Sequence, residues 1–243
     1  MIDQKIEHVV KWLREQVEVS KTNGILVGLS GGIDSSVVAC LIKKAFPDNS
    51  IGVILPCKSN DKDKADGEAV AKACDIDYIE VELSEVHEKL FSSVKSALGS
   101  RGENRRLTDA NLRARLRMST LYTVGNDMGY LVAGTDNAAE LLTGYFTKYG
   151  DGGVDILPIA RLTKRDVFEW AKHLGVPKSV IDRQPSAGLW EGQTDESEMG
   201  VTYNAIDDYL EGKPVSEEDK KVIERMNRVT EHKRIMPPMP SDF

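Results

Sequence analysis

The stretch Leu26–Ile42, LVGLSGGIDSSVVACLI, indicates the fold, because an apolar run leads into a glycine turn and apolar residues then return at helical spacing. A strand, a glycine turn and a helix in this order can bind a phosphate, since backbone N–H groups and the positive end of the helix dipole face the anion. The lysine of a Walker-type loop is missing, and Asp34 stands where a polyphosphate would be repelled. The stretch therefore predicts a phosphate loop that works with a carboxylate.

Strands and helices alternate outward from this stretch. We predict buried strands at 24–30, 51–56, 77–83, 130–135 and 154–159. We predict helices at 4–18, 34–46, 63–74, 84–98, 108–128 and 162–175. The alternation predicts a doubly wound α/β fold with a parallel five-stranded sheet and a helical C-terminal region. In such sheets ligands bind beyond the carboxyl ends of the strands.

The composition is that of an ordinary globular protein with an acidic balance. The chain has 243 residues, 40% of them hydrophobic, and a net charge of −7. A nucleic-acid binder that depends on a global basic field is therefore not expected. The apolar runs are too short to span a bilayer, and the N-terminus lacks the apolar core of a signal peptide. We expect one cytoplasmic domain over residues 1–243, with no membrane or nucleic-acid partner.

Neither cysteines nor histidines form a recognisable ligand pattern. Cys40, Cys57 and Cys74 make an odd number without CxxC spacing, and the four histidines are scattered. We expect three reduced thiols that pack as small hydrophobic groups, and no zinc site.

Polar residues gather at the ends of two predicted strands. Ser30, two glycines, Asp34 and two further serines follow the first strand, and Thr135, Asp136, Asn137 and Glu140 follow the fourth. A capped turn formed by Asp34 and Ser35 is the alternative for the first junction, but its dense run of serines and glycines favours phosphate binding. At the second junction, helix capping accounts for Asp136 or Asn137 about as well as ligand binding does. It accounts less well for Glu140. Mg²⁺ binds through one or two carboxylates together with substrate phosphates, so Asp34 and Glu140 are candidate magnesium ligands.

Long motifs in consistent order resemble one family. SGGIDSS (30–36) is similar to the signature of the ATP-pyrophosphatase, or PP-loop, superfamily. The segment GTDNAAELLTGYFTKYGDGGVDILPI (134–159) resembles the ammonia-dependent NAD⁺ synthetases of that superfamily. So do LTKRDV, PSAGLWEGQTDESEMG, YNAIDDYLEG and the closing EHKR, and the resemblance extends from about residue 4 to 236.

The resemblance implies a ligase reaction in two steps. The nicotinate carboxylate of deamido-NAD⁺ attacks the α-phosphorus of ATP, which gives an acyl-adenylate and magnesium pyrophosphate. Ammonia then attacks the carbonyl, which gives the amide of NAD⁺ and AMP. Positioning and charge neutralisation should supply most of the catalysis, since little covalent chemistry falls to the protein. A glutaminase domain, which glutamine-dependent relatives carry, has no room in 243 residues, so ammonia is expected as the nitrogen donor.

The resemblance also implies roles for individual residues. ATP would be bound by Gly28, Leu29, Ser30, Gly31, Gly32, Ile33, Asp34, Ser35, Ser36, Thr135, Lys164 and Ser186. Deamido-NAD⁺ would be bound by Arg117, Lys148, Asp155, His232 and Lys233. Asp34 and Glu140 would ligate Mg²⁺, and Asp34, Asp151 and Lys164 would be the catalytic residues, with Asp151 near the nicotinate and the ammonia. The family commonly has threonine where Ser186 stands, which keeps the hydroxyl.

Structural interpretations of the same residues stay open. Arg113, Arg115 and Arg117 could form a solvated helix face, and residues 151–153 could be a simple turn. Lys164 could be a surface lysine in a first helical turn, although the helix dipole disfavours a cation there. His232 and Lys233 stand at a helix C-terminus, where cations are favoured anyway.

Alternative functions are another ATP pyrophosphatase and a non-catalytic nucleotide-binding module. The tRNA-thiolating pyrophosphatases need cysteine pairs, and this chain has no cysteine beyond Cys74. A binding module would have no reason to keep Glu140, Asp151 and Lys164 together.

The family forms homodimers, and the helix at 108–128 is a candidate dimer element whose apolar residues would suit a monomer core equally well. We predict that residues 186–200 form a loop that is disordered without ligands and closes over the adenylate, because water would hydrolyse it.

Overall fold

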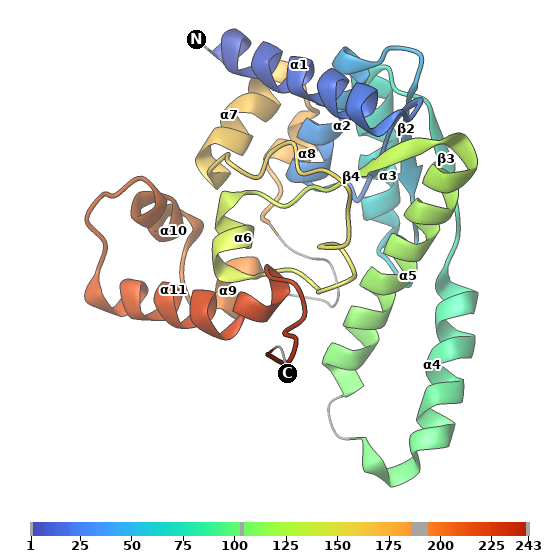
Figure 1. The fold of residues 1–243 in the computed structure, drawn as a ribbon, viewed down its shortest axis with the longest axis vertical. Helices are drawn as coiled ribbons and strands as arrows, with labels where there is room; N and C mark the ends of the chain where they lie inside the picture. Colours follow the sequence, from blue (N-terminus) through green and yellow to red (C-terminus); the bar gives the residue numbers. More distant parts are fainter. Residues whose placement is uncertain (1, 103–104, 186–193, 242–243) are drawn as a thin grey trace.

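The computed structural model describes residues 2–102, 105–185 and 194–241, and at its centre lies a four-stranded parallel sheet (Figure 1). The strands are β1 (Gly24–Gly28), β2 (Ser50–Ile54), β3 (Tyr78–Glu80) and β4 (Tyr130–Ala133), in the order β3-β2-β1-β4. β1 pairs in parallel with both β2 and β4, so the strand that leads into the predicted phosphate loop is central. The doubly wound α/β fold is thus confirmed.

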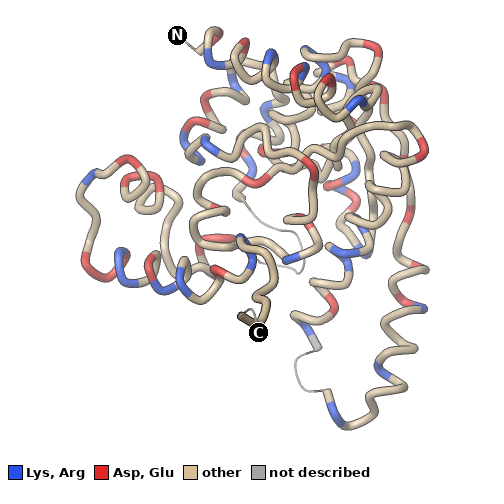
Figure 2. The backbone as a smooth tube through the Cα atoms, viewed as in Figure 1, with Lys and Arg blue, Asp and Glu red and all other residues tan. Residues whose placement is uncertain are grey.

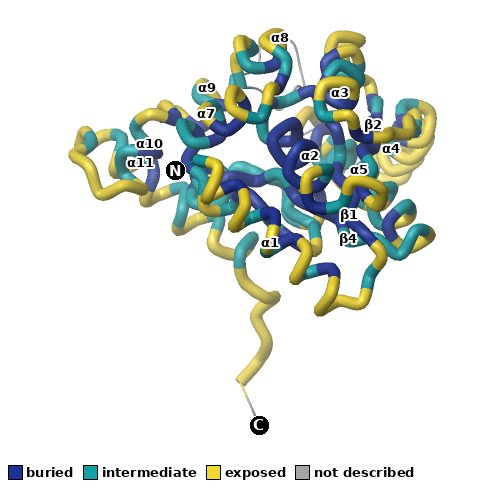
Figure 3. Tube along the Cα trace, turned by 90° about the horizontal axis from the view of Figure 1, so that it is seen from above, coloured by how far each residue is buried: buried dark blue, intermediate teal, exposed yellow. Residues whose placement is uncertain are grey.

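Helices cover both faces of the sheet. On one face α2 (Ile33–Ala45) and α3 (Asp61–Cys74) pack with α1 (Ile2–Ser20) and α7 (Lys164–Leu174). On the other face lies α5 (Arg105–Met128), with α4 (Ser84–Leu98) outside it. The two long helices run side by side away from the sheet (Figure 1). Figure 3 shows α2 and most of β1 and β2 buried, while much of α4 is exposed.

The alternation of side chains along β1 explains this double covering. Ile25 and Val27 point into the core with α2, and Leu26 between them points into the core with α5. All three are fully buried. A strand with an apolar residue at every position needs helices on both faces, and this is why the run is continuous rather than alternating.

The predicted fifth strand is wrong. Residues near Ile156 run beside β4, but they form only an isolated bridge with Ala133. The Val132 N–H donates to the Asp155 carboxylate (2.8 Å) instead of a backbone carbonyl, and Pro158 has no N–H to offer. The ladder therefore does not extend, and the sheet keeps four strands among the described residues.

The predicted C-terminal helical region is confirmed. Thr163 caps α7 through a capping box with Asp166, and Gly175 ends the helix in the left-handed region, close to the predicted bounds of 162–175. α8 (Lys178–Ile181), α9 (Asp195–Met199), α10 (Tyr203–Leu210) and α11 (Glu217–Val229) follow, and η2 (Glu231–Lys233) comes last. α9, α10 and α11 share a small apolar core with α6 (Ala138–Thr143), separate from the two cores of the sheet.

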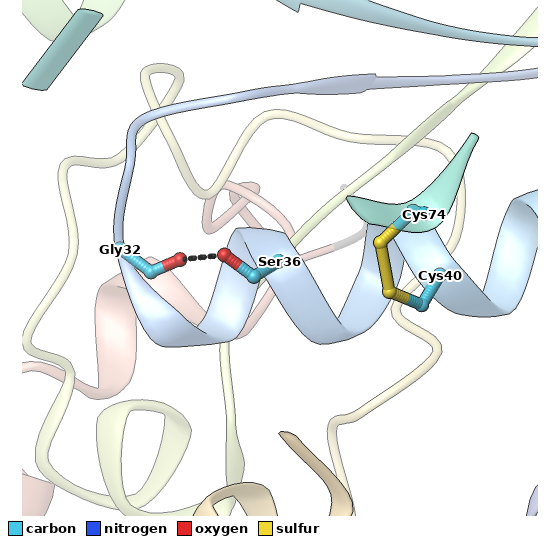
Figure 4. The surroundings of a disulfide bond; sticks show 4 residues. All are labelled: Gly32, Ser36, Cys40 and Cys74. Carbon is cyan, nitrogen blue, oxygen red and sulfur yellow. Dashed lines mark hydrogen bonds between the residues drawn. A yellow bond between two sulfur atoms is a disulfide. The ribbon is translucent and has the colours of Figure 1, made fainter. Parts of the chain in front are cut away.

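The expectation of three reduced thiols is wrong for two of them. Cys40 and Cys74 form a disulfide that joins the middle of α2 to the end of α3 (Figure 4). The two helices pack side by side on one face of the sheet, and this brings Cα atoms 34 residues apart to 5.2 Å. The spacing of two cysteines in the sequence does not show whether the fold brings their Cα atoms this close. Cys57 is a free, buried thiol, as expected.

Charged residues are spread over the whole chain rather than gathered on one face (Figure 2). Within the described ranges, no helix combines the length and the apolar character that crossing a membrane requires.

Candidate active site

A cleft of about 890 Å³ opens at the carboxyl ends of β1 and β4, where ligands bind in sheets of this kind. Its walls come from the loop between β1 and α2, the end of β4, residues 144–154, α7 and η2. Most of the residues predicted for the two substrates line this one cleft: Gly28, Leu29, Ser30, Gly32, Ile33, Asp34, Ser35, Thr135, Lys164, Arg117, Lys148, His232 and Lys233. Glu140 and Asp151 line it as well.

The phosphate loop is held by its own serines. The Ser30 hydroxyl accepts from the Gly32 N–H (3.2 Å) and lies 3.0 Å from the Ser35 hydroxyl. The hydroxyls of Ser35 and Ser36 both donate to the Gly32 carbonyl, the latter at 2.7 Å (Figure 4). Ser35 and Ser36 therefore fix the turn, and no side chain caps α2. The capping interpretation of Asp34 is wrong.

Gly31 is part of the loop but does not line the cleft. Its φ of +75° favours glycine, and a Cβ there would lie 2.6 Å from the Asp63 carbonyl oxygen. The loop thus packs directly on the first turn of α3. Ser36 is likewise buried behind the loop.

Lys164 lies between the two carboxylates proposed for the metal. Its Nζ is 2.6 Å from Asp34 Oδ2 and 3.4 Å from Glu140 Oε1. Only 2% of Lys164 is exposed, so the interpretation as a surface lysine is wrong. Burial alone would lower the pKa of Lys164, but the attraction of Asp34 and Glu140 raises it above its ordinary value. Burial raises the pKa of Glu140 to about 7, against the opposing effect of Lys164.

Asn137 joins the ends of β1 and β4. Its side chain caps α6 in a capping box with Glu140 and also donates to Asp34 Oδ1 at 2.9 Å. The residue that caps α6 thus also builds the site, because Asn137 orients Asp34 through its side-chain amide and Glu140 through its backbone N–H, which donates to Oε2 at 3.1 Å. Thr135 and Asp136 lie in the cleft wall just before it.

Three residues that the sequence did not single out support Lys164. The Asp207 carboxylate on α10 accepts from the N–H groups of Lys164 (3.0 Å) and Arg165 (2.8 Å), and this fixes the first turn of α7. The Tyr203 hydroxyl donates to Asp195 (2.9 Å) and Glu140 (3.3 Å), while its ring lies under Lys164 Nζ, 4.7 Å from the ring centre. These contacts come from α9 and α10, more than 30 residues away in sequence. The motif YNAIDDYLEG contains Tyr203 and Asp207, and it was the available signal.

Two further carboxylates face the cleft. Surrounding protein raises the pKa of Asp136 well above its ordinary value, and Asp151 and Glu140 add to the effect. Asp151 keeps one side open to the cleft, but protein crowds its other sides, and the desolvation raises its pKa too. Asp151 Oδ1 accepts from the Thr147 N–H at 2.9 Å, which also makes residues 147–153 a compact turn.

Basic residues at the other end of the cleft donate hydrogen bonds to backbone carbonyls. Arg117 donates to the Leu55 carbonyl (3.1 Å) and to the Ser59 hydroxyl (3.0 Å). Lys148 donates to the His232 carbonyl, and Lys233 donates to those of Gly144 (2.7 Å) and Phe146 (2.5 Å). The solvated-face interpretation is wrong for Arg117, whose burial lowers its pKa.

Arg115, on the same helix, is exposed and donates to the Lys148 carbonyl, whereas Arg113 pairs with Asp109.

Asp155 stands apart from the other predicted residues. It does not line the cleft, and its two oxygens accept from the Val132 N–H and the Tyr122 hydroxyl. Burial and Asp155 together raise the pKa of Tyr122 to about 12. Ser186 and the greater part of the predicted 186–200 loop lie outside the described residues. The loop prediction is wrong for 195–199, which form α9 under a Thr194 cap.

The donor set fits a hard cation that also binds phosphate. In the described part of the chain, no group of three or more histidine, cysteine or acidic side chains is arranged to hold a metal alone. Asp34 and Glu140 nevertheless both face the one ammonium of Lys164, at 2.6 and 3.4 Å, and both carboxylates line the cleft. Oxygen ligands from one or two carboxylates completed by substrate phosphates are the coordination that Mg²⁺ prefers.

Comparisons with known proteins agree with this arrangement. The model of the family described as NAD synthase matches residues 5–237. A relative named NH(3)-dependent NAD(+) synthetase, from Alkaliphilus metalliredigens, is 62% identical over 99% of both chains. The NMN synthetase of Francisella tularensis has a TM-score of 0.94 at 38% identity, over 100% of this chain and 99% of that one. The NH3-dependent NAD synthetase of Campylobacter jejuni has a TM-score of 0.80 at 26% identity, over 99% of both. By its sequence, its fold and the residues of its cleft, the chain belongs to the NAD synthase family.

Proposed function

We propose that this chain is an ammonia-dependent ligase that converts deamido-NAD⁺ to NAD⁺ with cleavage of ATP to AMP and pyrophosphate. The observation that carries the proposal is one continuous cleft, which joins a phosphate loop at one end to a set of basic residues at the other. A nucleotide-binding module would need only the first end. Residues 1–243 then act as one synthetase domain.

The first step needs ATP and the nicotinate carboxylate in line. The N–H groups of 30–36 and the N-terminus of α2 bind the β- and γ-phosphates, and Lys164 stabilises charge that develops on the pyrophosphate. A carboxylate oxygen bonds to the α-phosphorus while the bond from that phosphorus to the bridging oxygen breaks. Arg117, Lys148 and His232 bind the dinucleotide so that its nicotinate reaches this point.

The second step needs a proton acceptor near the acyl carbonyl. Ammonia bonds to the carbonyl carbon, AMP leaves, and the surplus proton of the nitrogen must move to a base. Asp151 faces the cleft, is fixed by Thr147, and has a raised pKa that makes its carboxylate a stronger base. We assign Asp151 this role.

Mg²⁺ is the proposed cofactor, with Asp34 and Glu140 as its protein ligands. When bound, it would neutralise phosphate charge that the excess carboxylates would otherwise repel. The support is the donor set itself, in which the two carboxylates of Asp34 and Glu140 face the one ammonium of Lys164.

A direct assay tests this proposal. Purified protein with Mg²⁺, ATP, ammonium and deamido-NAD⁺ should form NAD⁺, AMP and pyrophosphate in equal amounts, and omission of any one substrate should stop the reaction. AMP release that needs neither ammonium nor deamido-NAD⁺ would indicate a different pyrophosphatase, and no NAD⁺ at all would reject the assignment.

A second candidate product is nicotinamide mononucleotide. The observation that favours it is the TM-score of 0.94 with the Francisella NMN synthetase, against 0.80 with the Campylobacter NAD synthetase. The chemistry would be identical, with nicotinate mononucleotide in place of deamido-NAD⁺. The ratio of kcat/KM for these two acids under the same conditions decides which one is the substrate.

We also propose a homodimer, with the exposed side of α4 as part of its interface. Val86, Leu90, Val94 and Leu98 follow one another at intervals of four, so they form an apolar stripe, and each is at least 42% exposed. By contrast, Leu116 of the helix first considered packs against the sheet. Light scattering should show a dimer for the wild type and a monomer for Leu90→Glu/Val94→Glu.

A further inference from the structure

Arg183 is a cation in the cleft wall to which neither substrate assignment gives a role. It follows α8, lines the cleft and has a side chain that is 24% exposed. Its Nη2 lies 2.6 Å from Asp63 Oδ1, and its Nη1 lies 3.4 Å from Asp66 Oδ2. One guanidinium from the C-terminal region thus joins two carboxylates in the first half of α3.

These carboxylates lie directly behind the phosphate loop. A Cβ on Gly31 would be 2.6 Å from the Asp63 carbonyl oxygen and 3.0 Å from Asp66 Cβ, so the loop and α3 are in van der Waals contact. Asp66 is buried, and Asp63 lines the cleft. Any shift of this turn of α3 must therefore move the backbone that faces the phosphates.

The charges of Asp63 and Asp66 also link Arg183 to the phosphate loop. Asp63 and Asp66 carry two negative charges on the turn of α3 that packs on Gly31 through the Asp63 carbonyl and Asp66 Cβ, next to a loop that has to receive a polyphosphate. Carboxylates with little solvent around them interact over such distances with only partial screening. Arg183 is the cation that offsets them, in the same way that Lys164 offsets Asp34 and Glu140 on the opposite side of the loop.

We propose that Arg183 is a positioning residue for ATP, which acts by neutralising Asp63 and Asp66 and by holding the first turn of α3 against Gly31. The inference rests on the proposed function, because it concerns the ATP end of the same cleft. It specifies that Arg183 acts through α3 rather than by touching the nucleotide.

Arg183→Met tests whether Arg183 contributes to ATP binding. The KM for ATP should rise about tenfold, whereas kcat and the KM for deamido-NAD⁺ stay within about twofold, since the other end of the cleft is untouched. Arg183→Lys keeps the charge and should lie between the wild type and Arg183→Met. Arg165→Met is the matched control: Arg165 also joins two carboxylates, Asp208 and Glu211, but lies outside the cleft, and its removal should leave all constants unchanged.

A triple variant tests whether Arg183 acts by neutralising Asp63 and Asp66. In Asp63→Asn/Asp66→Asn/Arg183→Met the repulsive charges are gone, so the KM for ATP should return to within about threefold of the wild type. A triple variant as impaired as the single one would mean that Arg183 does not act by neutralising Asp63 and Asp66, and it would overturn the inference. An unchanged KM in Arg183→Met would overturn it as well.

A folding defect, and a failure of the proposed function, can both be distinguished from a failure of the inference. Should Arg183→Met not fold, as judged by its melting curve, Arg183→Lys and the triple variant still test the inference. Arg183→Lys keeps the cation beside Asp63 and Asp66, and the triple variant removes the cation together with both carboxylates. A wild type that makes no AMP from ATP would reject the proposed function instead.

Discussion

The two ends of the cleft use their basic residues in opposite ways. At the ATP end, Lys164 and Arg183 are each bound to two carboxylates, with Nζ and Nη2 both 2.6 Å from the nearer oxygen. At the other end, Arg117, Lys148 and Lys233 donate to backbone carbonyls of neighbouring loops. The first end is a closed electrostatic network, whereas the second holds cations whose partners are neutral.

This difference indicates which end is rearranged by its ligand. A phosphate or carboxylate adds the attraction of a full negative charge to its hydrogen bond with a lysine, which a neutral backbone carbonyl lacks, so such a substrate group can displace a carbonyl from a lysine. It gains little by competing with a buried carboxylate. We therefore expect the ATP end to be ready before substrates bind, and the other end to exchange its partners on binding.

The largest effect that tests the closed network is expected for Lys164→Met. Asp34 and Glu140 would lose their buried counter-charge, which should cost about 3 to 5 kcal/mol of unfolding free energy. Activity should fall by about 10²- to 10³-fold, because charge on the pyrophosphate would lose its stabilising group. Urea unfolding and steady-state turnover measure the two effects.

The matched control for that variant is Lys213→Met. Lys213 also pairs with two carboxylates, Asp208 and Glu211, but it is more than half exposed and lies outside the cleft. Its loss should change stability by less than about 1 kcal/mol and activity not at all. Equal losses in both variants would show that the buried network has no special role.

The next largest effect is expected for the disulfide, because it joins α2, the helix that follows the phosphate loop, to α3. Cys40 is in α2, and Cys74 closes a loop of 34 residues back to it. Reduction of the wild type should lower the unfolding free energy by about 4 kcal/mol in the chain-entropy model. Cys40→Ser/Cys74→Ser should show the lower value with or without reductant. A thiol titration of the native protein that finds three free thiols would contradict the bond.

Lys148→Met tests the exchangeable end and should have a smaller effect. Lys148 makes one bond to the His232 carbonyl, so its loss should leave stability nearly unchanged. A charge-assisted bond to the substrate should be lost, which raises the KM for deamido-NAD⁺ by about tenfold, with the KM for ATP unaltered. A change in the KM for ATP of equal size would show that the two ends are not independent.

The sequence predicted the two ends unequally well. Leu26–Ile42 located the phosphate loop because strand, turn and helix are contiguous there, and local signals suffice for such a unit. The capping of α7 by Thr163 was equally local. The partners of Lys164 were not: Tyr203 and Asp207 approach it only because α10 packs against α6 and α7. Composition and spacing do not report such packing.

The errors have the same origin. The apolar run at 154–159 has the composition of a strand, but the side chain of Asp155 takes the N–H that a further strand would have needed. Cys40 and Cys74 were each consistent with a packed thiol until two helices brought them together. In both cases a tertiary contact overrode a sound local pattern.

The smallest predicted effect concerns His87, which supports the exchangeable end from behind. His87 on α4 is fully buried, stacks on Phe91 and lies 3.2 Å from Asp109 of α5, the helix that carries Arg117. Burial lowers the pKa of His87, an effect that Asp109 opposes and that Lys58 and Arg113 reinforce. The folded protein therefore favours the neutral ring.

The sign of the pH dependence follows from this shift. Below about pH 6.5 the unfolded chain binds a proton at His87 that the folded chain binds more weakly, so stability is lost as the pH falls below that point. Urea midpoints of the wild type should fall between pH 7.5 and 5.5 by more than those of His87→Phe, which has no titrating ring. Equal slopes would mean that folding does not shift the pKa of His87, and a wild type that gains stability relative to His87→Phe as the pH falls would mean that Asp109 holds His87 protonated as an ion pair between α4 and α5.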